Sequence, residues 1–110
     1  MTYELLLLPR AERDIDGIIR YLSQRSPQGA IAWCDRWEQA LDELRSRPLE
    51  CGLAPESSHY GTSVRQLLCK TRRGRMYRAL FTVVGRGVYI LHVRAPGRDL
   101  LPRDQLRRGR

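Results

Sequence analysis

The sequence predicts an α+β domain with the element order β-α-α-β-β-β, in which an antiparallel helical hairpin packs on a small, mostly antiparallel sheet. Two segments of the first half carry apolar residues at helical spacing and are separated by only two or three residues, which forces the helices into an antiparallel pair. The second half holds apolar segments joined by short connections that contain glycine, as in β-hairpins. Both helical stripes need an apolar partner, and the sheet must supply it.

A chain of 110 residues, of which 42% are hydrophobic, corresponds to one globular domain with a single core. We expect this domain to span residues 1–101, followed by a basic tail over residues 102–110. Neither a membrane-spanning apolar run nor a signal-peptide pattern is present, so we expect a cytoplasmic protein without a membrane partner. The three cysteines lack Cys-x-x-Cys spacing, which favours reduced thiols and predicts neither a metal site nor a cofactor.

The first strand is predicted over Tyr3–Leu8, an apolar segment that ends where Pro9 follows. Proline fits the first turn of a helix, because its missing N–H has no partner there anyway. The first helix is therefore expected to begin at this point and to end near Gln24. Its apolar stripe consists of Ala11, Ile15, Ile18, Ile19 and Leu22.

The second helix is predicted to begin at Ser26, an N-cap residue followed by Pro27, and to run to about Arg47. Its apolar residues recur at intervals of three and four, which marks the face toward the sheet. We interpret the two tryptophans on this face as residues of the core or of a groove wall rather than as a platform for base stacking. The stripe consists of Ala30, Cys34, Trp37, Leu41 and Leu44, with Trp33 and Ala40 alongside.

A loop over residues 48–63 is followed by three strands, predicted over Val64–Lys70, Arg75–Val84 and Val88–Arg94. Successive side chains of a strand point to opposite faces, which assigns one face of each strand to the helices. The side chains of the last two strands that are expected to face the helices are Tyr77, Ala79, Phe81, Val83, Tyr89, Leu91 and Val93. Those expected on the opposite face are Met76, Arg78, Leu80, Thr82, Val88, Ile90, His92 and Arg94.

Basic side chains on the face away from the helices form the candidate site. In the strand that ends at Lys70, alternation does not determine which of the two faces points away from the helices. We take the more polar face to point away, which places Lys70 on the open side of the sheet. Guanidinium groups donate bidentately to phosphates and carboxylates, so an anionic partner is indicated. The residues expected to converge on this open face are Lys70, Arg78, His92 and the binding residue Arg94, with Arg98 and the further binding residues Arg72, Arg73 and Arg75 at its rim.

The charge is divided unevenly along the chain. Residues 1–60 carry seven arginines and ten carboxylates, a net charge of −3. Residues 61–110 carry thirteen lysines and arginines against two aspartates, a net charge of +11. This polarity indicates one basic surface and an acidic partner, either a nucleic acid or a protein.

Cleavage of RNA through the ribose 2′-hydroxyl would suit this set, because it requires a base, an acid and cations but no protein nucleophile. Arg78 and Lys70 are the candidate cations, and His92 is the candidate base near neutral pH. A structural alternative stands beside each role. His92 would then be a hydrogen-bonded core or rim residue. Arg78 would pair with a carboxylate on a helix and, if exposed, contribute about 1 kcal/mol at most to folding.

Several segments occur in an order and spacing that are more specific together than any of them alone. Through these segments the chain resembles the RelE/ParE superfamily of toxins from type II toxin–antitoxin systems. It resembles the ParE branch more closely through the pattern Asp-Ile-x-x-Ile-x-x-Tyr-Leu over residues 14–22 and through the long second helix. RelE-like nucleases commonly carry further basic or histidine residues after the last strand and a tyrosine near the C-terminus, whereas here residues 94–99 contain no histidine and no tyrosine follows Tyr89. The segments are residues 11–22, 40–48, 64–67, 76–81, 88–93 and 97–99.

The resemblance implies a toxin with a role in plasmid stabilization that a cognate antitoxin neutralises. ParE-like members inhibit DNA gyrase, whereas RelE-like members cleave mRNA on the ribosome. We therefore expect a gyrase inhibitor, with a ribosome-dependent endoribonuclease as the alternative and a non-toxic, antitoxin-binding member as a second alternative. In a nuclease, Arg78 would match the catalytic arginine that follows tyrosine in the third strand. The other catalytic residues expected in that case are Lys70, Arg98 and His92.

Overall fold

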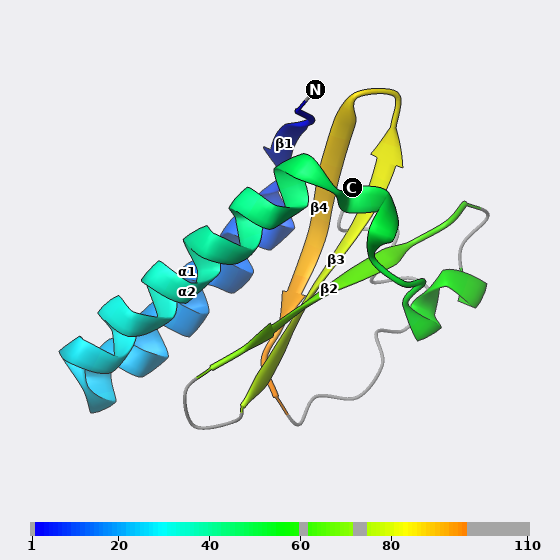
Figure 1. The fold of residues 1–110 in the computed structure, drawn as a ribbon. Helices are drawn as coiled ribbons and strands as arrows, with labels where there is room; N and C mark the ends of the chain where they lie inside the picture. The colour runs from blue at the N-terminus through cyan, green and yellow to red at the C-terminus, as the bar shows by residue number, and fades with distance from the viewer. Residues whose placement is uncertain (1, 60–61, 72–74, 97–110) are drawn as a thin grey trace.

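The computed structural model describes residues 2–59, 62–71 and 75–96, and it confirms the predicted α+β fold and element order (Figure 1). The helical hairpin consists of α1 (Pro9–Arg25) and α2 (Pro27–Ser46). The strands are β1 (Glu4–Leu7), β2 (Arg65–Lys70), β3 (Met76–Val84) and β4 (Gly87–Arg94). The connection between α2 and β2 contains two short 3-10 helices, η1 (Pro48–Glu50) and η2 (Pro55–His59). The basic tail predicted over residues 102–110 lies outside the described residues.

A single residue, Ser26, turns the chain from α1 into α2. Its backbone N–H donates to the carbonyl oxygen of Leu22 at 2.8 Å, while its Oγ accepts from the N–H of Gly29 at 3.1 Å and caps α2. Pro27 then occupies the first turn of α2, where no backbone donor is needed. This local chemistry explains the tight hairpin that the sequence predicts. Within the ranges that the structure describes, no helix combines the length and the apolar character needed to cross a membrane.

The four strands lie in the order β1-β4-β3-β2, and the helical hairpin covers one face of the sheet (Figure 1). β3 is antiparallel to both of its neighbours, whereas β1 runs parallel to β4 and pairs with its first half. Gly85 turns the chain between β3 and β4 with a φ of 57°, a left-handed conformation that glycine adopts without a steric penalty. The sheet is therefore mostly antiparallel, as predicted.

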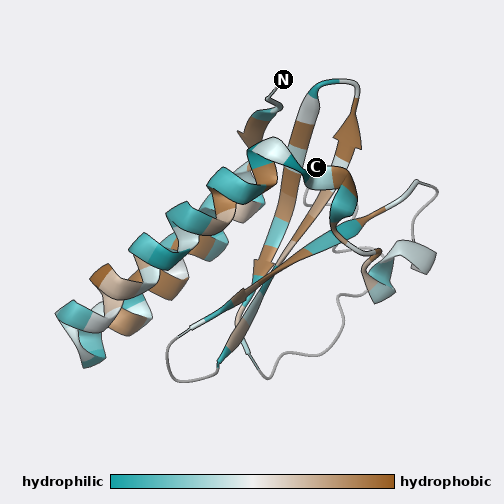
Figure 2. Ribbon diagram, in the orientation of Figure 1, coloured by the Kyte–Doolittle hydropathy of each residue, from teal (hydrophilic) through white to brown (hydrophobic). Residues whose placement is uncertain are grey.

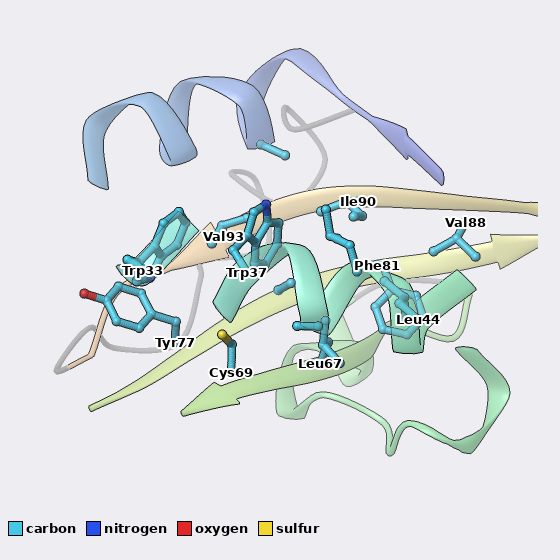
Figure 3. Packing of buried hydrophobic residues seen from close by; sticks show 14 residues of the cluster. Trp33, Trp37, Leu44, Leu67, Cys69, Tyr77, Phe81, Val88, Ile90 and Val93 are labelled. Atoms are coloured by element: carbon cyan, nitrogen blue, oxygen red, sulfur yellow. The ribbon is translucent and has the colours of Figure 1, made fainter. Parts of the chain in front are cut away.

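The main core fills the space between the hairpin and the sheet, as Figure 3 shows. Hydropathy follows this division, because the strands and the inner sides of the helices are largely hydrophobic while the outer sides of the helices are hydrophilic (Figure 2). Trp33 stacks on Trp37 with ring centres 5.7 Å apart, and it meets Tyr77 of β3 edge to face at 5.6 Å. The prediction that both tryptophans are core residues is therefore confirmed.

The predicted faces of β4 are wrong for part of the strand, because a β-bulge interrupts the alternation. Leu80 is opposite His92 and Phe81 is opposite Ile90, so Leu91 is an extra residue in β4. Beyond the bulge the original parity returns. Contrary to the prediction, Val88 and Ile90 belong to the helix-facing core. Tyr89, which is opposite Thr82 of β3, and Leu91, which belongs to the second apolar cluster, lie on the other face of the sheet.

Phe81 tests the contribution of the main core. The side chain is completely buried between β2, β4 and the hairpin, so we expect Phe81→Ala to lower the free energy of unfolding by about 3–5 kcal/mol. Urea denaturation followed by circular dichroism measures this change. Val84→Ala is the matched control on the same strand, because Val84 is 60% exposed, and it should change stability by no more than about 0.5 kcal/mol. Equal effects of the two substitutions would contradict the described packing.

Candidate functional site

The connection between α2 and β2 covers part of the sheet face that lies away from the helices. Ala54 and Val64 of this connection pack on Leu80 and Leu91 in a second apolar cluster, against which Leu8 also packs. The connection is closed on itself, since the N–H of Ala54 donates to the carbonyl oxygen of Val64 at 2.8 Å. The prediction of an open basic face is therefore wrong for this part of the sheet.

Arg78 belongs to this covered face and is held by a carboxylate. Its two Nη atoms donate to both carboxylate oxygens of Glu56 at 3.0 and 2.8 Å, and Nη1 also donates to Oε1 of Gln66 at 3.1 Å. The Glu56 side chain is fully buried, and that of Arg78 is 18% exposed. The structural alternative considered for Arg78, an ion pair, is confirmed, although the carboxylate comes from η2 rather than from either long helix.

This pair restricts the chemistry open to Arg78. The bidentate carboxylate of Glu56 occupies the guanidinium edge formed by the two Nη atoms of Arg78, which is an edge that would otherwise hold a phosphate. A phosphate on this edge would have to displace Glu56 and separate its buried carboxylate from the Arg78 cation, which costs on the order of several kcal/mol. In this arrangement Arg78 fastens the connection to the sheet.

His92 is also completely buried, beside α1. Its Nδ1 lies 3.7 Å from Oδ2 of Asp14, and the same oxygen accepts from the backbone N–H of Val93 at 3.0 Å. The N–H of Val93 lies on the edge of β4 beyond the end of β1, so Asp14 provides the acceptor that a neighbouring strand would otherwise provide. The other carboxylate oxygen of Asp14, Oδ1, accepts from Nε of Arg10 at 3.1 Å. A general base must reach the proton that it removes, so a fully buried His92 fits the structural role better than the catalytic one.

The other predicted residues that the structure describes lie toward one end of the sheet. Lys70, the last residue of β2, is exposed, while Leu67 and Cys69 belong to the helix-facing core. The more polar choice for the faces of β2 is therefore confirmed. In the register of β3 and β4, Arg94 is directly opposite Arg78. The predicted residues that lie outside the described ranges are Arg72, Arg73 and Arg98.

A cleft of about 730 Å³ opens between α1 and the outer ends of β3 and β4, and three arginines line it. Two of them, Arg75 and Arg94, are among the predicted binding residues. The third, Arg13, is missing from the prediction, because sorting side chains by strand alternation ignores the polar side of a helix. A signal for it exists in the sequence, since Arg13, Gly17 and Tyr21 recur at intervals of four and so share one side of α1.

The cysteines do not add a reactive group to this site. All three are free thiols, and burial raises the pKa of the Cys69 and Cys51 thiols. Both thiols therefore stay protonated and weakly nucleophilic at neutral pH. Among the residues that the structure describes, no cluster of His, Cys, Asp or Glu side chains is arranged to hold a metal ion.

The order of the elements and the helical hairpin on a mixed sheet are those of a toxin of the RelE/ParE superfamily, as the sequence resemblance implied. A family model described as the ParE toxin of the type II toxin–antitoxin system parDE matches residues 5–100. The chain therefore belongs to the ParE toxin family. No curated protein shows a significant match to the chain.

The buried pair leads to a prediction that differs from the small effect expected of an exposed arginine. Arg78→Met leaves the fully buried carboxylate of Glu56 without its cation, so we expect the free energy of unfolding to fall by about 3–5 kcal/mol. The double variant Arg78→Met/Glu56→Met removes both charges and should recover most of this loss, because an apolar pair of similar volume needs no compensation. Urea denaturation of the three proteins measures the difference.

Arg45→Ala is the control for this comparison. Arg45 pairs with Asp42 at 2.7 Å, but both side chains are exposed, so its removal should cost less than about 1 kcal/mol. If Arg78→Met destabilised the protein no more than Arg45→Ala does, the ion pair with Glu56 would not be a structural fastening.

Proposed function

We propose that this ParE-family toxin acts in the cytoplasm by binding and inhibiting DNA gyrase without cleaving nucleic acid, and that a cognate antitoxin neutralises it. The observation that carries the proposal is the engagement of Arg78 by Glu56 and Gln66. Arg78 is the residue on which a RelE-like mechanism would depend, and here both of its Nη atoms donate to protein acceptors.

The same argument extends to proton transfer. Ribonucleolytic cleavage requires a base within hydrogen-bond reach of the ribose 2′-hydroxyl, and His92 is completely buried next to Asp14. Lys70 is exposed at the end of β2, but a lone ammonium group provides charge without the base. The described residues therefore support a toxin that works by binding better than they support a nuclease.

Charge supports neutralisation by an acidic antitoxin. The net charge of +11 over residues 61–110 attracts and orients an acidic, amphipathic segment. Inhibition of gyrase and relief by such an antitoxin are compatible with one basic surface, which the antitoxin would occupy in competition with the target.

A supercoiling assay with purified gyrase tests the proposal. We expect the toxin to inhibit the supercoiling of relaxed plasmid in a dose-dependent manner, whereas mRNA on programmed ribosomes should stay intact in the presence of the same toxin concentration. In cells, induced expression should cause the SOS response and filamentation before translation stops.

The double variant Arg78→Met/Glu56→Met is the informative partner in both assays, because it removes the arginine without leaving a buried charge. A gyrase inhibitor should keep its activity in this variant. Cleaved mRNA together with normal supercoiling would overturn the proposal in favour of the endoribonuclease. A folded protein that does neither would support the non-toxic, antitoxin-binding alternative.

A further inference from the structure

The cleft beside α1 has both basic and apolar walls. It lies between the polar side of α1, the start of β3 and the end of β4, and its volume of about 730 Å³ falls within the range of ligand-binding pockets. Because it receives side chains from three elements, its geometry depends on the whole fold. Its lining includes Arg13, Gly17, Tyr21, Arg75, Tyr77 and Arg94.

The charge of the cleft is positive. Arg13, Arg75 and Arg94 line it from α1, from the residue before β3 and from the end of β4. The single carboxylate among the lining residues, Asp14, is occupied by the N–H of Val93 and by Arg10. In the part of the chain that the structure describes, neither Arg13 nor Arg75 forms an ion pair. An acidic ligand would therefore meet guanidinium groups that are available for bidentate hydrogen bonds.

The remaining walls are apolar and aromatic. Ile18 and Tyr77 line the cleft, and burial raises the pKa of Tyr77, so its phenol stays neutral although Arg75 acts in the opposite direction. Tyr21 is 49% exposed, and Arg25 lies over its ring at 4.6 Å. Gly17 leaves room between Arg13 and Tyr21, because a Cβ atom added there would meet nothing within 4 Å.

We infer that this cleft binds a peptide segment of a protein partner, in which a carboxylate side chain is followed or preceded by an apolar one. The carboxylate reaches the arginines and the apolar side chain lies against Tyr21 and Ile18. The aliphatic Ile18 in the wall favours a peptide over a nucleic-acid strand, because a strand carries phosphates, sugars and bases but no aliphatic side chain that could pack against it. The identification of this partner as the antitoxin rests on the proposed function, whereas the chemistry of the cleft does not.

Fluorescence anisotropy tests the charged half of the inference. The probe is a fluorescein-labelled amphipathic peptide built from glutamate and leucine, and its counterpart with glutamine in place of glutamate is the ligand control. We expect the acidic peptide alone to bind, and Arg13→Gln or Arg75→Gln to weaken binding by about tenfold or more. Arg47→Gln removes the same charge at the far end of α2, outside the cleft, and should leave binding nearly unchanged.

Gly17→Leu tests the space itself without removing any charge. Leucine favours a helix more than glycine does, so this variant should fold at least as well as the unmodified protein while its side chain fills the cleft. We expect peptide binding to fall by about tenfold or more, since the occupied volume is lost. Ser23→Leu, which adds the same side chain to an exposed position of α1 outside the cleft, should retain binding.

The inference would be overturned if the acidic peptide did not bind, or if Gly17→Leu left its binding unchanged. It would also be overturned if a short single-stranded RNA displaced the peptide and if Arg13→Gln, Arg75→Gln and Gly17→Leu weakened the binding of that RNA. The last would assign the cleft to nucleic acid. A protein that binds the peptide but does not inhibit gyrase would refute the proposed function alone. Inhibition of gyrase without peptide binding would refute the cleft alone.

Discussion

The carboxylate of Glu56 is fully buried and meets both nitrogens of the Arg78 guanidinium group. Separating the two charges would cost on the order of several kcal/mol, so the pair fixes the position of η2 on the sheet. The second apolar cluster of Ala54, Val64, Leu80 and Leu91 forms beneath the same connection. With this cover on one face and the helical hairpin on the other, the sheet has little open surface at its centre. The arginine-lined cleft lies at one end of the sheet, beside α1.

The β-bulge at Leu91 determines which side chains of β4 face the helices. Because the bulge adds one residue opposite Leu80 and Phe81, the strand can place Ile90 and Val93 on the same side of the sheet. The end of β4 extends past β1, and Asp14 of α1 takes the place of a strand by accepting from the N–H of Val93. This contact keeps α1 close to the end of the sheet, where the arginine-lined cleft is found.

The sequence predicts the helices and hairpins well because their signals are local. The Ser26–Pro27 pair and the helical stripes determine α1 and α2, and Gly85 marks the turn between β3 and β4. The faces of β4 could not be predicted, because nothing in a run of apolar residues distinguishes a bulge from regular alternation.

The candidate site depends on partners that are distant in the sequence. Glu56 is separated from Arg78 by 22 residues and lies in a segment predicted as loop, so no spacing rule connects the two. Strand alternation predicts His92 on an open face, because the sequence does not show that the side chain is buried beside Asp14 of α1. The sequence does not predict the cleft for a related reason. Arg13 lies in the first helix, whereas the basic residues of the predicted site all lie in the second half of the chain.

The central claim is that the Arg78 guanidinium group is a structural fastening rather than an anion-binding group. The most direct measurement is nitrogen-detected NMR of the arginine side chains, recorded before and after the addition of inorganic phosphate and then of a short single-stranded RNA. Bound bidentately to Glu56, Arg78 should show Nη protons that exchange slowly with water and resonances that neither ligand shifts. Rapidly exchanging Nη protons at Arg78, or a shift that saturates as either ligand is added, would contradict the account.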